Sequence, residues 1–170
     1  MMFDSTYQMA SPRLRGYGAS ARELIRAPRN LGPVREPDSK GRATAHHCRG
    51  RIEVQLKVDR DTRRVREARF VASGCPAITA TLSLATEEIK GKRIKEVMHL
   101  DWCEILYLLG AVPAESEGCV RAAVAAVREA AYDYLDRLST EETCPGTPRA
   151  RILSAREVSK ALTLVSAILK

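Results

Sequence analysis

The sequence predicts a fold of mixed α and β structure, in which antiparallel strands in the middle of the chain are followed by several helices. Residues 52–58 alternate between apolar and polar side chains, which is typical of a strand with one face toward solvent. A polar turn at residues 59–62 and a second strand-like run at 65–72 make a hairpin the simplest arrangement. From residue 76 onward apolar side chains recur at helical spacing, which predicts a series of helices.

The chain suits one domain of ordinary size with extra segments at its ends. It has 170 residues and a hydrophobic content of 45%, and because aromatic residues make up only 5% the core must be aliphatic. Residues 1–19 show no periodicity and are expected to be loose and flexible. The folded domain is predicted over residues 20–140, followed over 141–170 by a loop and a C-terminal amphipathic helix.

The first part of that domain is predicted to hold little regular structure. A short helix from residue 19 to about residue 26 ends before Pro28 and Gly32. Residues 32–42 read as a polar, proline-containing loop that contributes little to the core. Since two strands alone are marginally stable, a third strand is expected around residues 43–47.

A cysteine lies where the second strand gives way to the first long helix. Proline is favoured in the first turn of a helix, so the helix over residues 76–89 is predicted to begin at Pro76 with Cys75 at its cap. Gly74 removes side-chain bulk and permits positive φ at the corner. The partial positive charge at a helix N-terminus favours the thiolate over the thiol. The thiolate is the form that binds metal.

The remaining helices place a second cysteine in the same kind of position. A short segment over residues 94–100 precedes a helix that Asp101 caps and Gly110 ends. A long helix capped by Ser116 follows, with Cys119 in its first turn, where the helix dipole is again expected to lower the thiol pKa. Cys48, at the head of the alternating strand, is the third candidate.

Charge and cysteine usage narrow the function classes. The 28 basic and 21 acidic residues give a net charge of +7, which could indicate nucleic acid, an anionic surface or an acidic protein partner. The arginines are scattered, without a basic helix face or interleaved aromatics, so nucleic acid is an unlikely partner. No apolar run approaches a membrane span, and five cysteines without a C-x-x-C pair argue against a disulfide framework or a zinc ribbon. We therefore expect a cytoplasmic protein without membrane contact.

Several short tracts share the spacing of one known domain family. Pro28-Arg29-Asn30-Leu31-Gly32 is similar to its N-P-R-N-x-G tract, and Cys48, Gly74-Cys75 and Cys119 match its three cysteines. Further matches are Lys57-Val58-Asp59, Arg69-Phe70, Ser83-Leu84-Ala85-Thr86 and Gly91-Lys92. Over about residues 20–138 the chain resembles the U-type iron-sulfur cluster scaffold family, represented by IscU, the N-terminal domain of NifU, and SufU.

The resemblance implies a compact α+β domain, with a small antiparallel sheet of about three strands covered by helices. It implies that Cys48, Cys75 and Cys119 hold iron or a nascent [2Fe-2S] cluster. Sulfur would come as persulfide from a cysteine desulfurase, with Cys119 as the acceptor, and the cluster would pass to apo iron-sulfur proteins. Such a protein is a scaffold and not an enzyme with turnover of its own.

The chain departs from the family at three places. Gly50 stands where the family has an acidic residue, and Gly118 stands where IscU-like members have a histidine. Residues 112–116 lack the basic residue of the tract that binds a dedicated chaperone, so the resemblance does not predict that interaction. SufU-like members also lack the histidine and bind zinc while relaying sulfur, which makes a zinc-binding sulfur acceptor the main alternative. A relative that has lost the cluster is another.

Three thiolates leave the fourth position of a tetrahedral metal unfilled. If the strand were regular from Ala45 onward, His46 would share a face with Cys48, which makes His46 a candidate metal ligand. Water or an exogenous thiol is an equal alternative, and Cys103 or His47 a lesser one. Cys103 is otherwise expected to pack in a helix, and Cys144 to be a free surface thiol.

Overall fold

The structure is a computed structural model that describes residues 14–143, with side chains described as far as residue 140. The chain divides after Leu138 into two compact units, and the fold given below is that of the first. The predicted C-terminal amphipathic helix and Cys144 lie outside the described residues. None of the helices in the described part is long and apolar enough to cross a membrane.

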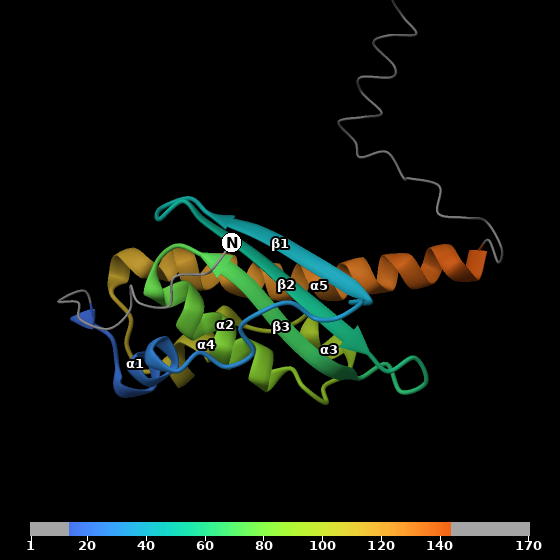
Figure 1. Ribbon diagram of the computed structural model, residues 1–170, viewed down its shortest axis with the longest axis horizontal. Helices are drawn as coiled ribbons and strands as arrows, with labels where there is room; N and C mark the ends of the chain where they lie inside the picture. Colours follow the sequence, from blue (N-terminus) through green and yellow to red (C-terminus); the bar gives the residue numbers. More distant parts are fainter. Residues whose placement is uncertain (1–13, 144–170) are drawn as a thin grey trace, which may run out of the picture. The chain divides into compact units, whose positions relative to one another are not determined.

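The fold is of the α+β class, as the sequence predicts. Three antiparallel strands form one sheet in the order β1-β2-β3, and they span Ser39–Ala45, Gly50–Val58 and Val65–Ser73 (Figure 1). The helices are α1 (Ala19–Arg26), α2 (Pro76–Glu88), α3 (Ile94–Val97), α4 (Trp102–Leu109), the 3-10 helix η3 (Ala114–Ser116) and α5 (Glu117–Thr143). Asp101 caps α4 by accepting a hydrogen bond from the backbone N–H of Cys103, as expected.

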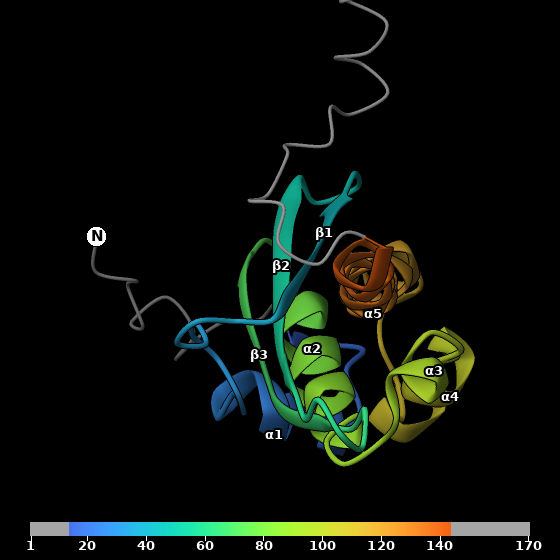
Figure 2. The same ribbon diagram turned by 90° about the vertical axis from the view of Figure 1, so that its right-hand side faces the viewer.

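Helices cover one face of the sheet, and the core lies between the two layers. Figure 2 shows α2 and α5 beside each other on that face. The inward side chains are mostly aliphatic, with Phe70 as the largest fully buried one. The largest others are Ile25, Leu56, Ile78, Leu82, Ile89, Ile94, Ile105 and Leu109. The prediction of an aliphatic core is confirmed.

The first strand begins earlier than the sequence predicts. β1 starts at Ser39, so the predicted loop over residues 32–42 is wrong for its last four residues. The inward side chains of β1 are small because the backbone of α5 approaches the strand closely. A Cβ atom added at Gly41 would collide with backbone atoms of Ala126 and Ala130. Val34 is buried as well, and its N–H donates to Gln55 Oε1 over 2.8 Å, so the loop also contributes to the core.

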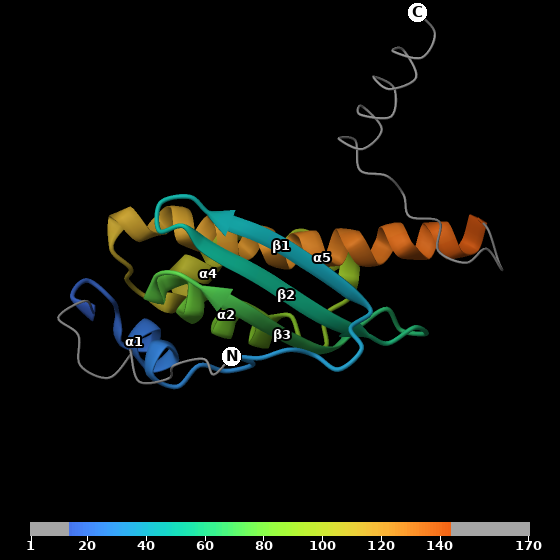
Figure 3. The same ribbon diagram turned by 45° about the horizontal axis from the view of Figure 1, so that its top comes forward.

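The tract around Asn30 serves the architecture of the domain. It pairs with the free edge of β3, because Phe70 N–H donates to Asn30 O and Gly32 N–H donates to Phe70 O. Figure 3 shows this connection running from α1 along β3 toward β1. Asn30 has a left-handed φ of 59°, and its side-chain amide donates to Thr86 Oγ1 and Glu87 Oε2 of α2. One residue therefore fixes the connection to both layers.

Candidate metal centre

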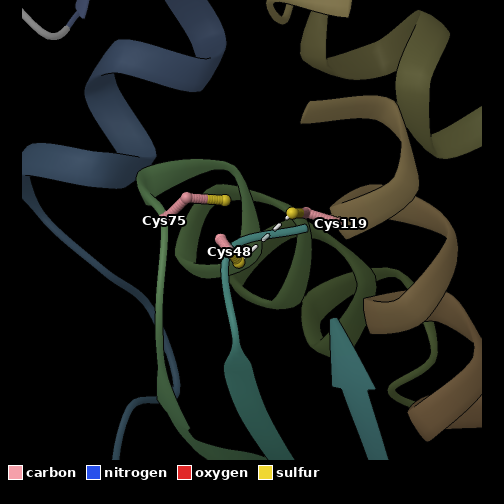
Figure 4. Close-up of side chains that lie close together, drawn as sticks. All are labelled: Cys48, Cys75 and Cys119. Atoms are coloured by element: carbon pink, nitrogen blue, oxygen red, sulfur yellow. Dashed lines mark hydrogen bonds between the residues drawn. The ribbon is translucent and has the colours of Figure 1, made fainter. Parts of the chain in front are cut away.

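Three thiols from distant parts of the chain converge at one end of the sheet (Figure 4). Cys48 lies in the turn between β1 and β2, Cys75 is the N-cap residue of α2, and Cys119 lies in the first turn of α5. The three Sγ atoms all lie within 4.8 Å of one another, and the Sγ atoms of Cys48 and Cys119 are 3.3 Å apart. The structure therefore brings together the three cysteines that the sequence singles out.

Two glycines let the chain close around Cys48. Gly74 has a φ of +129°, in the region that favours glycine, and a Cβ atom there would lie 2.8 Å from Gly50 Cα. A Cβ atom added at Gly50 would lie 2.7 Å from Ser73 O and 3.1 Å from Cys48 Sγ. Because residues 50 and 74 have no side chains, the sulfur of Cys48 can pack directly against their backbone.

The sulfur positions fit a thiolate-bound metal. In a tetrahedral site with bonds of about 2.3 Å, the ligand sulfurs are about 3.8 Å apart. The 3.3 Å between the Sγ atoms of Cys48 and Cys119, and the 4.8 Å within which all three sulfurs lie, are on either side of that value, so the three sulfurs are near enough to share one metal ion. In residues 14–140 this is the one group of three or more cysteine, histidine or carboxylate ligand atoms gathered in this way.

The three thiols do not ionise alike, because they differ in burial and in the amides around them. Burial opposes the ionisation of Cys48, but backbone N–H groups of Cys75 and Gly50 and the neighbouring thiols donate to its sulfur, and the net effect lowers its pKa. Cys48 therefore carries the first negative charge when the group is metal-free.

Cys75 and Cys119 behave in the opposite way to the helix-dipole prediction. Burial raises the pKa of Cys75 and, more strongly, that of Cys119, whose side chain is fully buried. The neighbouring thiols raise the pKa of Cys119 further, because a second thiolate beside the first is unfavourable. The expectation that both thiol pKa values are lowered is wrong, since desolvation outweighs the charge at the helix ends.

His46 does not share a strand face with Cys48. Residues 46–49 form a turn, so side chains there do not alternate as they would in a regular strand. His46 and His47 are both exposed, and the assignment of His46 as a ligand stays a prediction. Cys103 is exposed on α4, which contradicts the expectation that it packs.

Tyr17 is a site neighbour that the sequence reasoning missed. It lies in the segment expected to be loose, yet its side chain is 4% exposed and its hydroxyl lies 3.5 Å from Ser116 Oγ, so the expectation is wrong for residues 14–18. Burial raises the pKa of Tyr17, and the thiols of Cys75 and Cys119 act on it electrostatically. The segment has no periodicity, and an aromatic residue in an aromatic-poor chain is the only sequence signal.

The family assignment rests on the match of the chain to a family model. Residues 17–141 match the model described as the NifU-like N terminal domain, which is most of the chain. The chain belongs to the NifU-like N-terminal domain family. The matched range contains the three converging cysteines and the strands and helices that position them.

Curated relatives of this NifU-like domain carry names in iron-sulfur cluster assembly. It is 33% identical over 107 residues to the iron-sulfur cluster assembly scaffold protein IscU 1 of Archaeoglobus fulgidus, covering 63% of this chain and 69% of that protein. It is 32% identical over 127 residues to iron-sulfur cluster assembly protein 1 of Arabidopsis thaliana, covering 73% of this chain and 75% of that one.

Two solved structures share the fold of this NifU-like domain. One is a putative scaffold protein for the SUF system from Fervidobacterium islandicum, with a TM-score of 0.56, 13% identity and coverage of 68% of this chain and 96% of that one. The other is a NifU-like N-terminal domain from Brucella abortus, with a TM-score of 0.53, 18% identity and coverage of 71% and 94%. At these identities the likeness concerns the fold alone.

Proposed function

We propose that this NifU-like domain is an iron-sulfur cluster assembly scaffold that receives sulfur, binds iron on Cys48, Cys75 and Cys119, and transfers the nascent [2Fe-2S] cluster to apo-proteins. The observation that supports it most is the convergence of three thiols from three separate elements within 4.8 Å. Thiolates are the ligands that hold iron-sulfur clusters. The relatives in this family are named scaffold proteins, which favours a carrier role over enzymatic turnover.

The sulfur step requires a thiolate on this chain and a persulfide on a cysteine desulfurase. The attacking thiol loses its proton, its sulfur bonds to the outer sulfur of the persulfide, and the desulfurase cysteine leaves as a thiolate that takes up a proton. The family resemblance assigns this step to Cys119. Since burial raises the pKa of Cys119, its deprotonation in this domain has to accompany metal binding or the docking of the desulfurase.

Zinc is the second candidate for the bound metal, and the presence of glycine at position 118 favours it. SufU-like members lack the same histidine and relay sulfur with zinc bound. Three thiolates and one exogenous ligand form an ordinary tetrahedral zinc site. In that case the domain would pass sulfur onward and would not build the cluster itself.

The proposal includes partners and a compartment. A cysteine desulfurase would be the sulfur donor and apo iron-sulfur proteins the recipients, while the dedicated chaperone is left out because residues 112–116 lack its basic residue. The four cysteines of the described residues are all free thiols, which fits the reducing cytoplasm that we propose as its location.

Anaerobic purification followed by metal and acid-labile sulfide analysis tests the proposal. Iron with sulfide supports the scaffold, and zinc without sulfide supports the sulfur relay. Alanine substitution of Cys48, Cys75 or Cys119 should remove most of the bound metal, whereas Cys103→Ala, on the exposed face of α4, should not. Loss of metal in the Cys103 variant equal to that in the other three would overturn the three-thiolate site.

A further inference from the structure

The hydroxyl of Tyr17 forms a buried polar contact across the fold. The ring belongs to the hydrophobic core, and Ser116, whose Oγ lies 3.5 Å from the hydroxyl, is itself only 7% exposed. The two residues are 99 positions apart in the sequence. A buried hydroxyl without a partner would be costly, so this contact holds both residues in place.

This hydroxyl lies beside the start of α5, the helix that carries Cys119. Ser116 directly precedes α5 and lies three residues before Cys119. The contact with Ser116 therefore holds the end of α5 that carries a site cysteine.

The backbone around Tyr17 is fixed on the loop that leads into α5. Gly18 N–H donates to Ala111 O over 2.8 Å, and a Cβ atom at Gly18 would lie only 2.7 Å from Ala111 N. Gly16, with a φ of +86°, packs so that a Cβ atom there would lie 3.3 Å from Pro113 Cγ. The hydroxyl is thus held by a backbone that cannot shift without moving this loop.

We propose that Tyr17 is a positioning residue of the metal site, whose hydroxyl sets the position of the Cys119 sulfur by holding Ser116 at the start of α5. The inference rests on the proposed function, because it presupposes a metal on the three thiolates. Groups that orient metal ligands from outside the ligand set influence metal affinity by about 10–100-fold when they are removed. The 3.5 Å contact is long, so the lower end of that range applies.

The test is an anaerobic titration of the full chain with Co²⁺. Binding is measured from the thiolate charge-transfer and d–d absorption bands. Tyr17→Phe removes only the hydroxyl, and we expect it to weaken Co²⁺ binding about tenfold and to change the d–d bands, which report the coordination geometry. Tyr134→Phe is the matched control, since Tyr134 is 5% exposed and its buried hydroxyl has no hydrogen-bond partner within the described residues. That variant should bind Co²⁺ like the unmodified protein.

Further variants separate positioning from a general loss of stability. Ser116→Ala should reproduce the effect of Tyr17→Phe, and the double variant should bind no more weakly than either single one, because both remove the same contact. A lowered melting temperature of Tyr17→Phe with an unchanged Co²⁺ affinity and spectrum would overturn the inference and leave the proposed function intact. Failure of the unmodified protein to bind Co²⁺ through its thiols would overturn both.

Discussion

Alanine substitutions at Gly50 and Gly118 should have effects of opposite sign on stability, although both glycines are close to a site cysteine. The family resemblance would place an acidic residue at the first position and, in IscU-like members, a histidine at the second, whereas this chain has glycine at both. A Cβ atom at Gly50 would lie 2.5 Å from Ile78 Cδ1 and 2.7 Å from the backbone oxygen of Ser73. At Gly118 nothing lies within 4 Å of the added atom.

These distances indicate how much each substitution should change the free energy of unfolding. Gly50→Ala forces a methyl group into packed backbone, and overpacking of this kind lowers the free energy of unfolding by about 1–3 kcal/mol. Gly118→Ala replaces a glycine in the first turn of α5 without a clash, and the lower backbone entropy of alanine raises the free energy of unfolding by at most about 1 kcal/mol. For a chain of this length each kcal/mol corresponds to about 2–4 °C in melting temperature.

Urea unfolding of the reduced, metal-free protein, followed by circular dichroism, measures both changes. We also expect Gly50→Ala to weaken zinc binding in competition with a chromophoric chelator, since the added methyl group would lie 3.1 Å from Cys48 Sγ and would displace it. Gly118→Ala should leave zinc affinity unchanged. Equal urea midpoints for Gly50→Ala and the unmodified protein would refute the close approach of residue 50 to Ser73.

Three further predictions concern reactivity and packing. In metal-free protein, iodoacetamide should label Cys48 before Cys119 and at a lower pH, because only the pKa of Cys48 is lowered; mass spectrometry showing Cys119 modified first would contradict this. Asn30→Ala should lower the free energy of unfolding by about 1–3 kcal/mol, since it removes hydrogen bonds to Thr86 and to the carboxylate of Glu87 on α2, and a urea midpoint like that of the unmodified chain would count against the role given to this side chain. Gly41→Ala should destabilise the domain by more than Gly50→Ala in the same assay, because every atom that it meets belongs to the backbone of α5; the reverse order would be evidence against that approach.

The sequence predicts the elements whose signals are local. Pro76 in the first turn of a helix and Gly74 before it were enough to place Cys75 at the start of α2, and the structure agrees. The alternation over residues 52–58 likewise gives β2. These signals reflect backbone conformations that are determined by interactions between residues close together in the sequence.

The features that sequence reasoning missed depend on contacts between distant segments. β1 alternates between inward and outward residues. Its inward residues are small, and one of them is Gly41, because the backbone of α5 approaches the strand. The sequence pattern is therefore typical of a polar loop. The thiol pKa of Cys119 is set by burial against the rest of the fold and not by its place in the helix. The position of Tyr17 is likewise fixed by a contact 99 residues away.

Gly50 and Gly118 have physically different surroundings. At Gly50 the backbone N–H donates to the sulfur of Cys48 and helps to lower its pKa, and the space that a carboxylate would need is filled by Ser73 and Ile78. An amide dipole stabilises the thiolate there, where a carboxylate would add a second negative charge beside it. At Gly118 an added Cβ atom would meet no neighbour within 4 Å. Residue 50 is therefore closed to a side chain, while residue 118 takes a Cβ atom without a clash, so we expect Gly118→His to leave the urea midpoint of the metal-free domain no lower than that of the unmodified protein.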